Sequence, residues 1–147
     1  MDKIREIIKD HELYFVNVGQ TVKDAVSIMA EKNIGAICVL DGDHLVGMFT
    51  ERDLMRRVVN TERLNAANTK IEDVMTKDLI IAESDETVKS ALAKMKKYKI
   101  RHMPVVENKK LIGIVSMRDL LLHDLSVKEE EIKLLDAYIT YSPMRME

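Results

Sequence analysis

The chain has 147 residues, 46% of them hydrophobic, which is enough to build the core of one domain or of two small units in contact. Its net charge of −2 provides no bulk field for nucleic acid or a membrane surface. No apolar run approaches the roughly eighteen residues of a membrane span, and charged residues interrupt the start where a signal peptide would lie. The single cysteine, Cys38, lies in an apolar run, so we expect a buried thiol, no CxxC site and a reducing, cytoplasmic location.

The first half of the chain predicts a β-α-β-β-α unit. Its elements are, in order, a helix-like turn (3–9), a strand (13–16), a helix (21–33), a strand (34–40), a returning strand (45–49) and a helix (50–59). Thr21 is a typical N-cap residue, and apolar residues follow it at helical spacing. Asp41-Gly42 predicts a hairpin turn between the last two strands.

The second half predicts the same order of elements. These are a helix-like turn (71–75), a strand (79–82), a helix (87–98), two strands (100–106 and 111–115) and a helix (117–125). Ser126 and Glu129 form a further capping-box pattern, so we expect a separate C-terminal helix with the apolar stripe Ile132, Leu135 and Ile139, which needs a partner. The predicted divisions are a lead-in (1–12), unit 1 (13–60), a connector (61–78), unit 2 (79–125) and a C-terminal helix and tail (126–147).

The two units are copies at an offset of 66 residues, which is the separation of Gly47 and Gly113. About thirteen of roughly forty aligned positions are identical without a gap, whereas chance would give about three. An open solenoid needs at least about three copies, so two copies predict a closed pair with pseudo-two-fold symmetry.

Each unit closes on a motif of glycine, two apolar residues, a hydroxyl, two further residues and aspartate, at residues 47–53 and 113–119. The hydroxyl and the acid three places later form a capping-box pattern at a strand–helix junction, where free backbone N–H groups suit a phosphate. The aspartate could bind the two hydroxyls of a ribose, or it could only cap its helix. The arginine before each aspartate suits a phosphate, or it could be a solvated surface residue.

This arrangement resembles the CBS-domain pair, also called a Bateman module, whose most specific mark is the motif that closes both units. The strand at 100–106 also matches the second strand of that family, whereas the first copy departs from it with Gly35-Ala36-Ile37-Cys38. The resemblance covers roughly residues 13–125. It implies an α+β fold of two β-α-β-β-α units, a homodimer formed through helices, and a regulated partner that the sequence does not name.

In that family each cleft is built across the repeats and binds an adenosine-containing ligand such as AMP, ADP, ATP, NAD or S-adenosylmethionine. Carried over, the first cleft combines Thr50, Arg52 and Asp53 with Leu79, Ile80, Ile100, Arg101, His102 and Met103. The second cleft combines Ser116, Arg118 and Asp119 with Leu13, Tyr14, Ile34, Gly35 and Ala36. Lys77, with His11 as its repeat equivalent, adds charge near the first cleft. We therefore expect the first cleft to hold more phosphate charge than the second, although His102 could instead be structural.

No carboxylate pair, activated nucleophile or metal-ligand cluster accompanies these groups in the sequence, so we expect no catalytic residue, no metal and no catalytic cofactor. The resulting interpretation is a non-catalytic adenine-nucleotide sensor of cellular energy state. One alternative is a protein- or RNA-interaction module with vestigial clefts, which would use the basic run 94–99. Another is a nucleotide hydrolase, which would need a general base that the sequence does not show.

Overall fold

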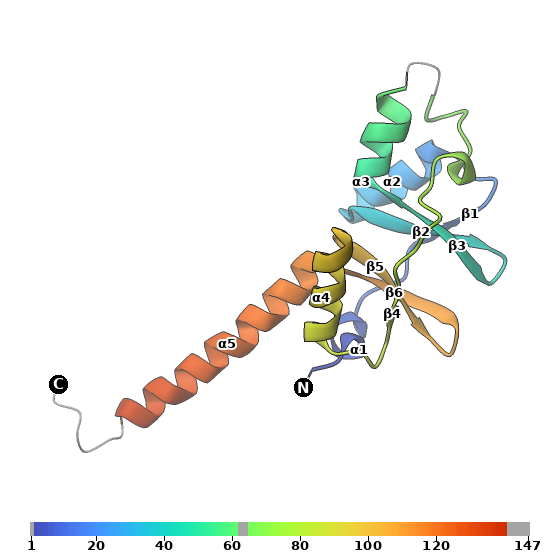
Figure 1. Ribbon diagram of the computed structural model, residues 1–147. Coiled ribbons are helices and arrows are strands. Elements are labelled where there is room, and N and C mark those ends of the chain that lie inside the picture. Colours follow the sequence, from blue (N-terminus) through green and yellow to red (C-terminus); the bar gives the residue numbers. More distant parts are fainter. Residues whose placement is uncertain (1, 62–64, 141–147) are drawn as a thin grey trace.

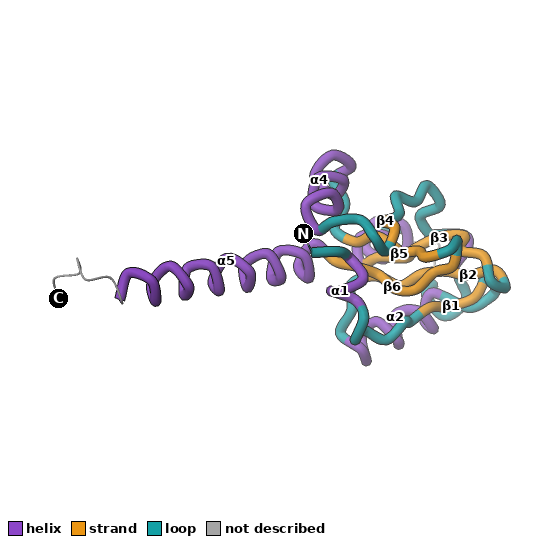
Figure 2. Tube along the Cα trace, turned by 90° about the horizontal axis from the view of Figure 1, so that it is seen from below, coloured by secondary structure: helices purple, strands orange, loops and turns teal. Residues whose placement is uncertain are grey.

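The structure is a computed structural model that describes residues 2–61 and 65–140, with side chains described as far as residue 137. Two three-stranded sheets form its centre, in the orders β1-β2-β3 and β4-β5-β6. Figure 2 shows the sheets together, with α4 (Val88–Tyr98) on one outer side and α2 (Val22–Lys32) on the other. The α+β fold of two equivalent units is confirmed.

Unit 1 contains β1 (Phe15–Asn17), α2 (Val22–Lys32), β2 (Ala36–Asp41), β3 (His44–Thr50) and α3 (Glu51–Asp53), which continues as a π-helical turn over Leu54–Val59. Helix α2 begins after Thr21, as predicted, and it does so in a capping box, in which the Thr21 side chain accepts from the Asp24 N–H and the Asp24 carboxylate accepts from the Thr21 N–H. Asn33 ends the helix in the left-handed region with φ 55°. Strand β2 pairs in parallel with β1 and antiparallel with β3.

Unit 2 contains β4 (Ala82–Glu83), α4 (Val88–Tyr98), β5 (His102–Glu107), β6 (Lys110–Ser116) and α5 (Met117–Thr140). Its strands pair as those of unit 1 do, and Thr87 caps α4 through the Ser90 N–H. The strands expected over 13–16 and 79–82 begin later, at Phe15 and Ala82, because β1 and β4 pair with β2 and β5 only from these residues onward.

The lead-in turn of each unit packs on the other unit. The N–H of Ile4, in α1 (Ile4–Ile8), donates to the Glu86 carbonyl of unit 2 at 2.9 Å. The N–H of Ile71, in the 3-10 turn Ile71–Asp73, donates to the Gln20 carbonyl of unit 1 at 2.8 Å. Ile4 belongs to the unit 2 core and Ile71 to the unit 1 core, and both are fully buried.

These lead-ins repeat at an offset of 67 residues, from Ile4 to Ile71, and not at the 66 of the rest of the chain. Two glycines show the same pairing, because a side chain at Gly47 would meet Met75 and one at Gly113 would meet Ile8. Carried two residues beyond Met75, the offset of 67 aligns Lys77 with Asp10, whereas the offset of 66 aligns it with His11.

The separate helix predicted from Ser126 is also wrong, because α5 runs unbroken from Met117 to Thr140. No glycine or proline interrupts this stretch, and a serine on an exposed helix face costs little. Figure 1 shows the far half of α5 projecting from the body, where Ile132 and Leu135 are 64% and 63% exposed. The side chain of Ile139, the third member of the predicted stripe, lies outside the described residues.

Candidate functional site

Both sequence motifs lie where an antiparallel strand ends and a helix begins. Thr50 Oγ1 accepts a hydrogen bond from the Asp53 N–H at 3.2 Å, and Asp53 Oδ2 accepts from the Thr50 N–H at 3.0 Å. Ser116 and Asp119 form the same reciprocal pair at 3.0 Å in each direction. Each aspartate therefore caps its helix with Oδ2, and any ligand contact depends on the remaining acceptor positions of the carboxylate.

A cavity of about 210 Å³ connects the unit 1 motif with unit 2. Its lining is Gly35, Met48, Thr50, Glu51, Arg52, Asp53 and Thr76 on one side and Ile100, Arg101 and His102 on the other. The structure thus brings together Thr50, Arg52, Asp53, Ile100, Arg101 and His102 of the predicted first cleft. The remaining predicted residues do not line this cavity: Lys77, Leu79, Ile80 and Met103. Met103 is fully buried in the unit 2 core, and Ile80 packs against that core.

The carboxylate of Asp53 is almost enclosed, with 8% of its side chain exposed. The Thr76 hydroxyl donates to it, with Oγ1 lying 3.0 Å from Oδ1 and 3.1 Å from Oδ2. Arg57 Nε lies 3.7 Å from Oδ1, while Arg57 Nη1 donates to the Met75 carbonyl at 2.8 Å. Arg57 lies in the π-helical turn, and it therefore links Asp53 to the segment that follows the 3-10 turn and carries Thr76.

Thr76, Met48 and Glu51 line the cavity, and the sequence did not predict them. Thr76 is 23 residues from Asp53, and nothing local marks it as a neighbour. Glu51 lies inside the motif at a position that the pattern leaves open. Its repeat equivalent is Met117, so the two copies differ by a charge at this point.

His102 lies directly against the backbone of Gly35. A Cβ placed on Gly35 would be 3.3 Å from His102 Cε1 and Nε2 and 3.4 Å from Glu51 Cδ. Burial lowers the pKa of His102, and Arg101 adds to this, while the Glu51 and Asp119 carboxylates act in the opposite direction. At neutral pH His102 is therefore an uncharged hydrogen-bonding ring, and only the arginines remain cationic.

The cavity has balanced charges. Arg52 and Arg101 are exposed cations at its edge, and no ion pair involves either of them within residues 2–61 and 65–140. Glu51 and Asp53 are the two carboxylates. With His102 neutral, the formal charge of the lining is zero, so the cavity is less favourable to phosphate than the arginines alone suggest.

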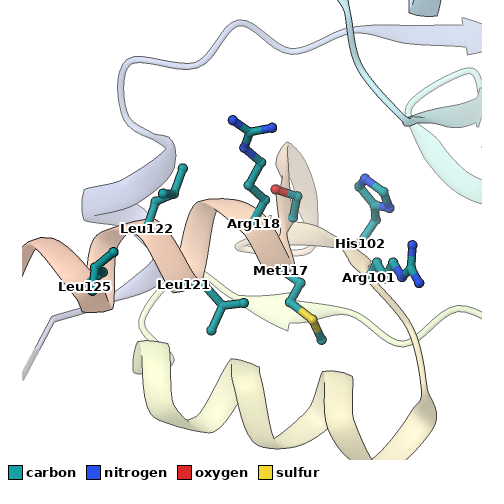
Figure 3. Close-up of a pocket in the computed structure, with 8 residues that line it drawn as sticks. Arg101, His102, Met117, Arg118, Leu121, Leu122 and Leu125 are labelled. Atoms are coloured by element: carbon teal, nitrogen blue, oxygen red, sulfur yellow. The ribbon is translucent and has the colours of Figure 1, made fainter.

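A second hollow, a groove of about 420 Å³, lies at the start of α5. Its lining is Arg101, His102, Ser116, Met117, Arg118, Leu121, Leu122 and Leu125 (Figure 3). Arg101 and His102 thus line both hollows, because the Met117 N–H donates to the Arg101 carbonyl at 2.7 Å and His102 pairs with Ser116 in the sheet. In Figure 3 Arg118 and His102 extend to the same side of α5.

The residues predicted for the second cleft do not line one of these two hollows together. Ser116 and Arg118 line the groove, whereas Leu13, Tyr14, Ile34 and Ala36 do not, and Gly35 lines the other cavity. Tyr14 and Ile34 pack against the unit 1 core. Asp119 stays close to His102, and no hydrogen bond reaches its Oδ1 from the described part of the chain.

Cys38 is fully buried, and burial raises its pKa to about 12, so the thiol stays protonated. Within the described residues no three His, Cys, Asp or Glu side chains are grouped so as to hold a metal ion. In the same residues no helix combines the length and apolarity needed to cross a bilayer.

Two matched β-α-β-β-α units, joined through their sheets with a hydroxyl–aspartate motif at each strand–helix junction, define a paired-repeat module. The model of the CBS domain family matches residues 4–60 and again 71–126, and the chain belongs to this family. The mitochondrial CBS domain-containing protein CBSX3 of Arabidopsis thaliana is 36% identical over 124 residues, which cover 81% of this chain and 60% of that protein. YlbB of Bacillus subtilis is 37% identical over 126 residues, covering 84% of this chain and 83% of that one.

Solved structures give the same result. A CBS-domain protein from Burkholderia ambifaria, described as a candidate signal-transduction protein, superposes with a TM-score of 0.79 at 34% identity, covering 85% of this chain and 95% of that one. The CBS domain pair of protein MJ0100 superposes with a TM-score of 0.74 at 27% identity, covering 87% and 98% of the two chains. That structure is a complex with 5′-methylthioadenosine and S-adenosyl-L-methionine. CBS pairs are regulatory modules, and some of them bind adenosine-containing ligands.

Proposed function

We propose that the chain is a non-catalytic regulatory module that binds an adenosine-containing ligand, such as AMP, ADP, ATP, NAD or an adenosyl thioether or sulfonium, between its two units. One observation carries this proposal. A single cavity unites the hydroxyl and aspartate of one motif, Thr50 and Asp53, with Ile100 and Arg101 of the other unit. A ligand in that position would touch both units at once, so its binding would change how they are held together.

The lining supplies a group for each part of such a ligand. Gly35 and Ile100 offer a flat, apolar place for a base, with backbone groups beside it. Asp53 suits a ribose diol, whose hydroxyls would take the place that the Thr76 hydroxyl now occupies. Arg52 and Arg101 reach the edge where a 5′ substituent would emerge.

The cavity volume of about 210 Å³ is below the roughly 300 Å³ at which ligand pockets usually begin. Two contacts make it small, namely His102 against Gly35 and Thr76 against Asp53. We infer that a ligand enlarges the cavity by parting these two contacts. Opening of this kind would move unit 2 relative to unit 1 and would provide the regulatory signal.

Isothermal titration calorimetry tests the proposal with AMP, ADP, ATP, NAD, S-adenosylmethionine and 5′-methylthioadenosine. Asp53→Ala should weaken binding about thirty- to a hundred-fold, because it removes a charge-assisted hydrogen-bond pair. Asp24→Ala is the matched control, since Asp24 occupies the same capping-box position at Thr21, away from the cavity. Equal effects of the two substitutions on affinity would show that Asp53 only caps its helix.

We further propose that the chain acts as a homodimer, in a cytoplasmic compartment, on a regulated protein partner. Two apolar pairs occupy equivalent positions on the last helices of the units, Met55 and Val59 on one and Leu121 and Leu125 on the other. All four are exposed, Met55 at 61%, Val59 at 73%, and Leu121 and Leu125 at 50% and 53%. Exposed apolar residues repeated in this way suit a symmetric contact through the helices.

The alternative of an RNA-binding module would use the basic face of α4. Lys94 is already engaged there, with Nζ 2.6 Å from Glu86 Oε1 and donating to the Ile81 carbonyl at 2.9 Å. Lys97 Nζ lies 5.3 Å from the ring centroid of Tyr98, the one aromatic residue of the run. This favours a solvated helix face, and retention on an RNA column that falls steeply with salt would contradict that interpretation.

A further inference from the structure

Glu51 is a carboxylate at the very place where a nucleotide sensor would be expected to gather positive charge. It lines the cavity, and Gly35 and His102 lie beside it. No hydrogen bond or ion pair engages its carboxylate within the described residues. Together with Asp53 it offsets the two cavity arginines.

The groove differs at the equivalent position. Met117 replaces the carboxylate, and Arg118 and Arg101 line the groove with no ion pair in the part of the chain that the structure describes. The formal charge of the groove lining is therefore +2, against zero for the cavity. A phosphate would be attracted by the positive lining of the groove. In the cavity it would also be repelled by the Glu51 carboxylate.

We propose that Glu51 makes the cavity selective for an adenosine ligand whose 5′ group is uncharged or cationic, as in an adenosyl thioether or sulfonium, and that phosphorylated ligands go to the groove beside Arg118. This inference rests on the proposed function and specifies its ligand class. It reverses the order expected from the sequence, in which the cavity held more phosphate charge than the second site. The reversal comes from Glu51, which the motif leaves open, and from the neutral state of His102.

The size of the effect follows from exposure. Glu51 is exposed, so a charge a few ångströms from its carboxylate interacts through a largely aqueous medium. One such interaction is worth about a five-fold change in affinity for each unit of ligand charge. Glu51 should therefore weaken a monophosphate relative to a thioether by about five-fold or more, and it should strengthen a cationic sulfonium relative to the thioether.

The test is calorimetric titration of 5′-methylthioadenosine, S-adenosylmethionine, AMP and ATP into the Arg118→Ala background, which removes a cation that lines the groove and does not line the cavity. Glu51→Gln removes the charge and keeps the shape, and Glu51→Met copies the residue that the second unit carries. Both should lower the ratio of 5′-methylthioadenosine affinity to AMP affinity about five-fold or more. Glu31→Gln, an exposed glutamate near the end of α2, is the matched control and should leave the ratio unchanged.

A reciprocal change tests the groove. Met117→Glu in the Asp53→Ala background should weaken AMP and ATP about five-fold relative to 5′-methylthioadenosine. If the ligand ratio stays the same in Glu51→Gln and Glu51→Met, or if ATP binds the cavity more tightly than 5′-methylthioadenosine, the inference is overturned while the proposed function stands. If these four ligands, ADP and NAD all fail to bind the native chain, the proposed function and this inference both fall.

Discussion

Replacing Thr76 by valine removes one hydroxyl from the cavity and keeps the size of the side chain. In the structure this hydroxyl donates to the Asp53 carboxylate at 3.0 and 3.1 Å, and that carboxylate is 8% exposed. A hydrogen bond to a charged group contributes about 1.5–3 kcal/mol. We therefore expect Thr76→Val to lower the free energy of unfolding by about 2 kcal/mol.

The same substitution should tighten ligand binding. In the native chain a ribose hydroxyl has to displace the Thr76 hydroxyl from the Asp53 carboxylate. In Thr76→Val no hydroxyl has to be displaced. After the change Asp53 Oδ1 keeps only Arg57 Nε, at 3.7 Å. Recovering most of the lost hydrogen bond from the ligand would raise the affinity about ten-fold.

Urea unfolding and calorimetric titration with AMP and 5′-methylthioadenosine measure the two effects. Thr69→Val is the matched control, because Thr69 is 6% exposed and its hydroxyl donates to the Asn65 carbonyl at 2.6 Å, away from the cavity. It should lose about 1 kcal/mol of stability with no change in affinity. A weaker affinity in Thr76→Val would refute the reasoning, since Thr76 would then contact the ligand itself.

Three further predictions concern pH, packing and assembly. Burial lowers the pKa of His102 from its ordinary 6.5, so the unfolded chain takes up a proton at a higher pH than the folded chain. The free energy of unfolding should therefore decline as pH falls below 6.5, and His102→Gln should show a shallower decline in urea unfolding. Gly47→Ala should lower the free energy of unfolding by about 1–3 kcal/mol, because the new methyl group meets Met75, and the same change should cost less when it is made in the Met75→Ala background. Val59→Ser with Leu125→Ser should shift the chain from dimer to monomer in sedimentation velocity.

Each of these has its own contrary result. Equal pH slopes in the native chain and His102→Gln would mean that His102 has the same proton affinity folded and unfolded. A smaller loss in Gly47→Ala than in Gly113→Ala would contradict this expectation, since a Cβ at Gly113 comes no closer than 3.2 Å to Ile8, at its Cδ1. For assembly, Leu134→Ser is the control, a 72% exposed residue on the projecting part of α5, and monomers produced by it as well would show that the apolar pairs are not specific.

The sequence alone predicted the repeat, the order of elements in each unit and the capped helix starts, because these depend on local signals. Thr21 and Thr87 precede apolar periodicity, and the structure caps both helices there. The motif spacing also predicted that Thr50 and Asp53 would bond reciprocally, as they do. The resemblance to paired repeats then predicted that they would meet Arg101 across the units.

The remaining features depend on tertiary contacts or on small differences in backbone geometry. Thr76 reaches Asp53 only because the lead-in strand folds back over β3, with the Thr76 N–H donating to the Met48 carbonyl at 2.8 Å. The repeat offset changes from 67 in the lead-ins to 66 in the rest of the chain, and this difference of one residue cannot be seen in the spacing of the hydrophobic residues. Ser126 is a typical N-cap residue, yet several leucines precede it and Lys128 and three glutamates follow it, all of them good helix formers, so α5 continues through it.

The crossed lead-ins set an order in which the chain can fold as it is synthesised. Unit 1 receives Ile71 and Met75 soon after its own strands are made, so it can close while the rest of the chain is still on the ribosome. Ile4 and Ile8 are made first, yet they belong to the core of unit 2, whose last strand ends at Ser116. This amphipathic turn therefore stays uncovered through most of translation, and its closure over the sequence distance from Ile4 to Glu86 makes unit 2 the slower half to complete.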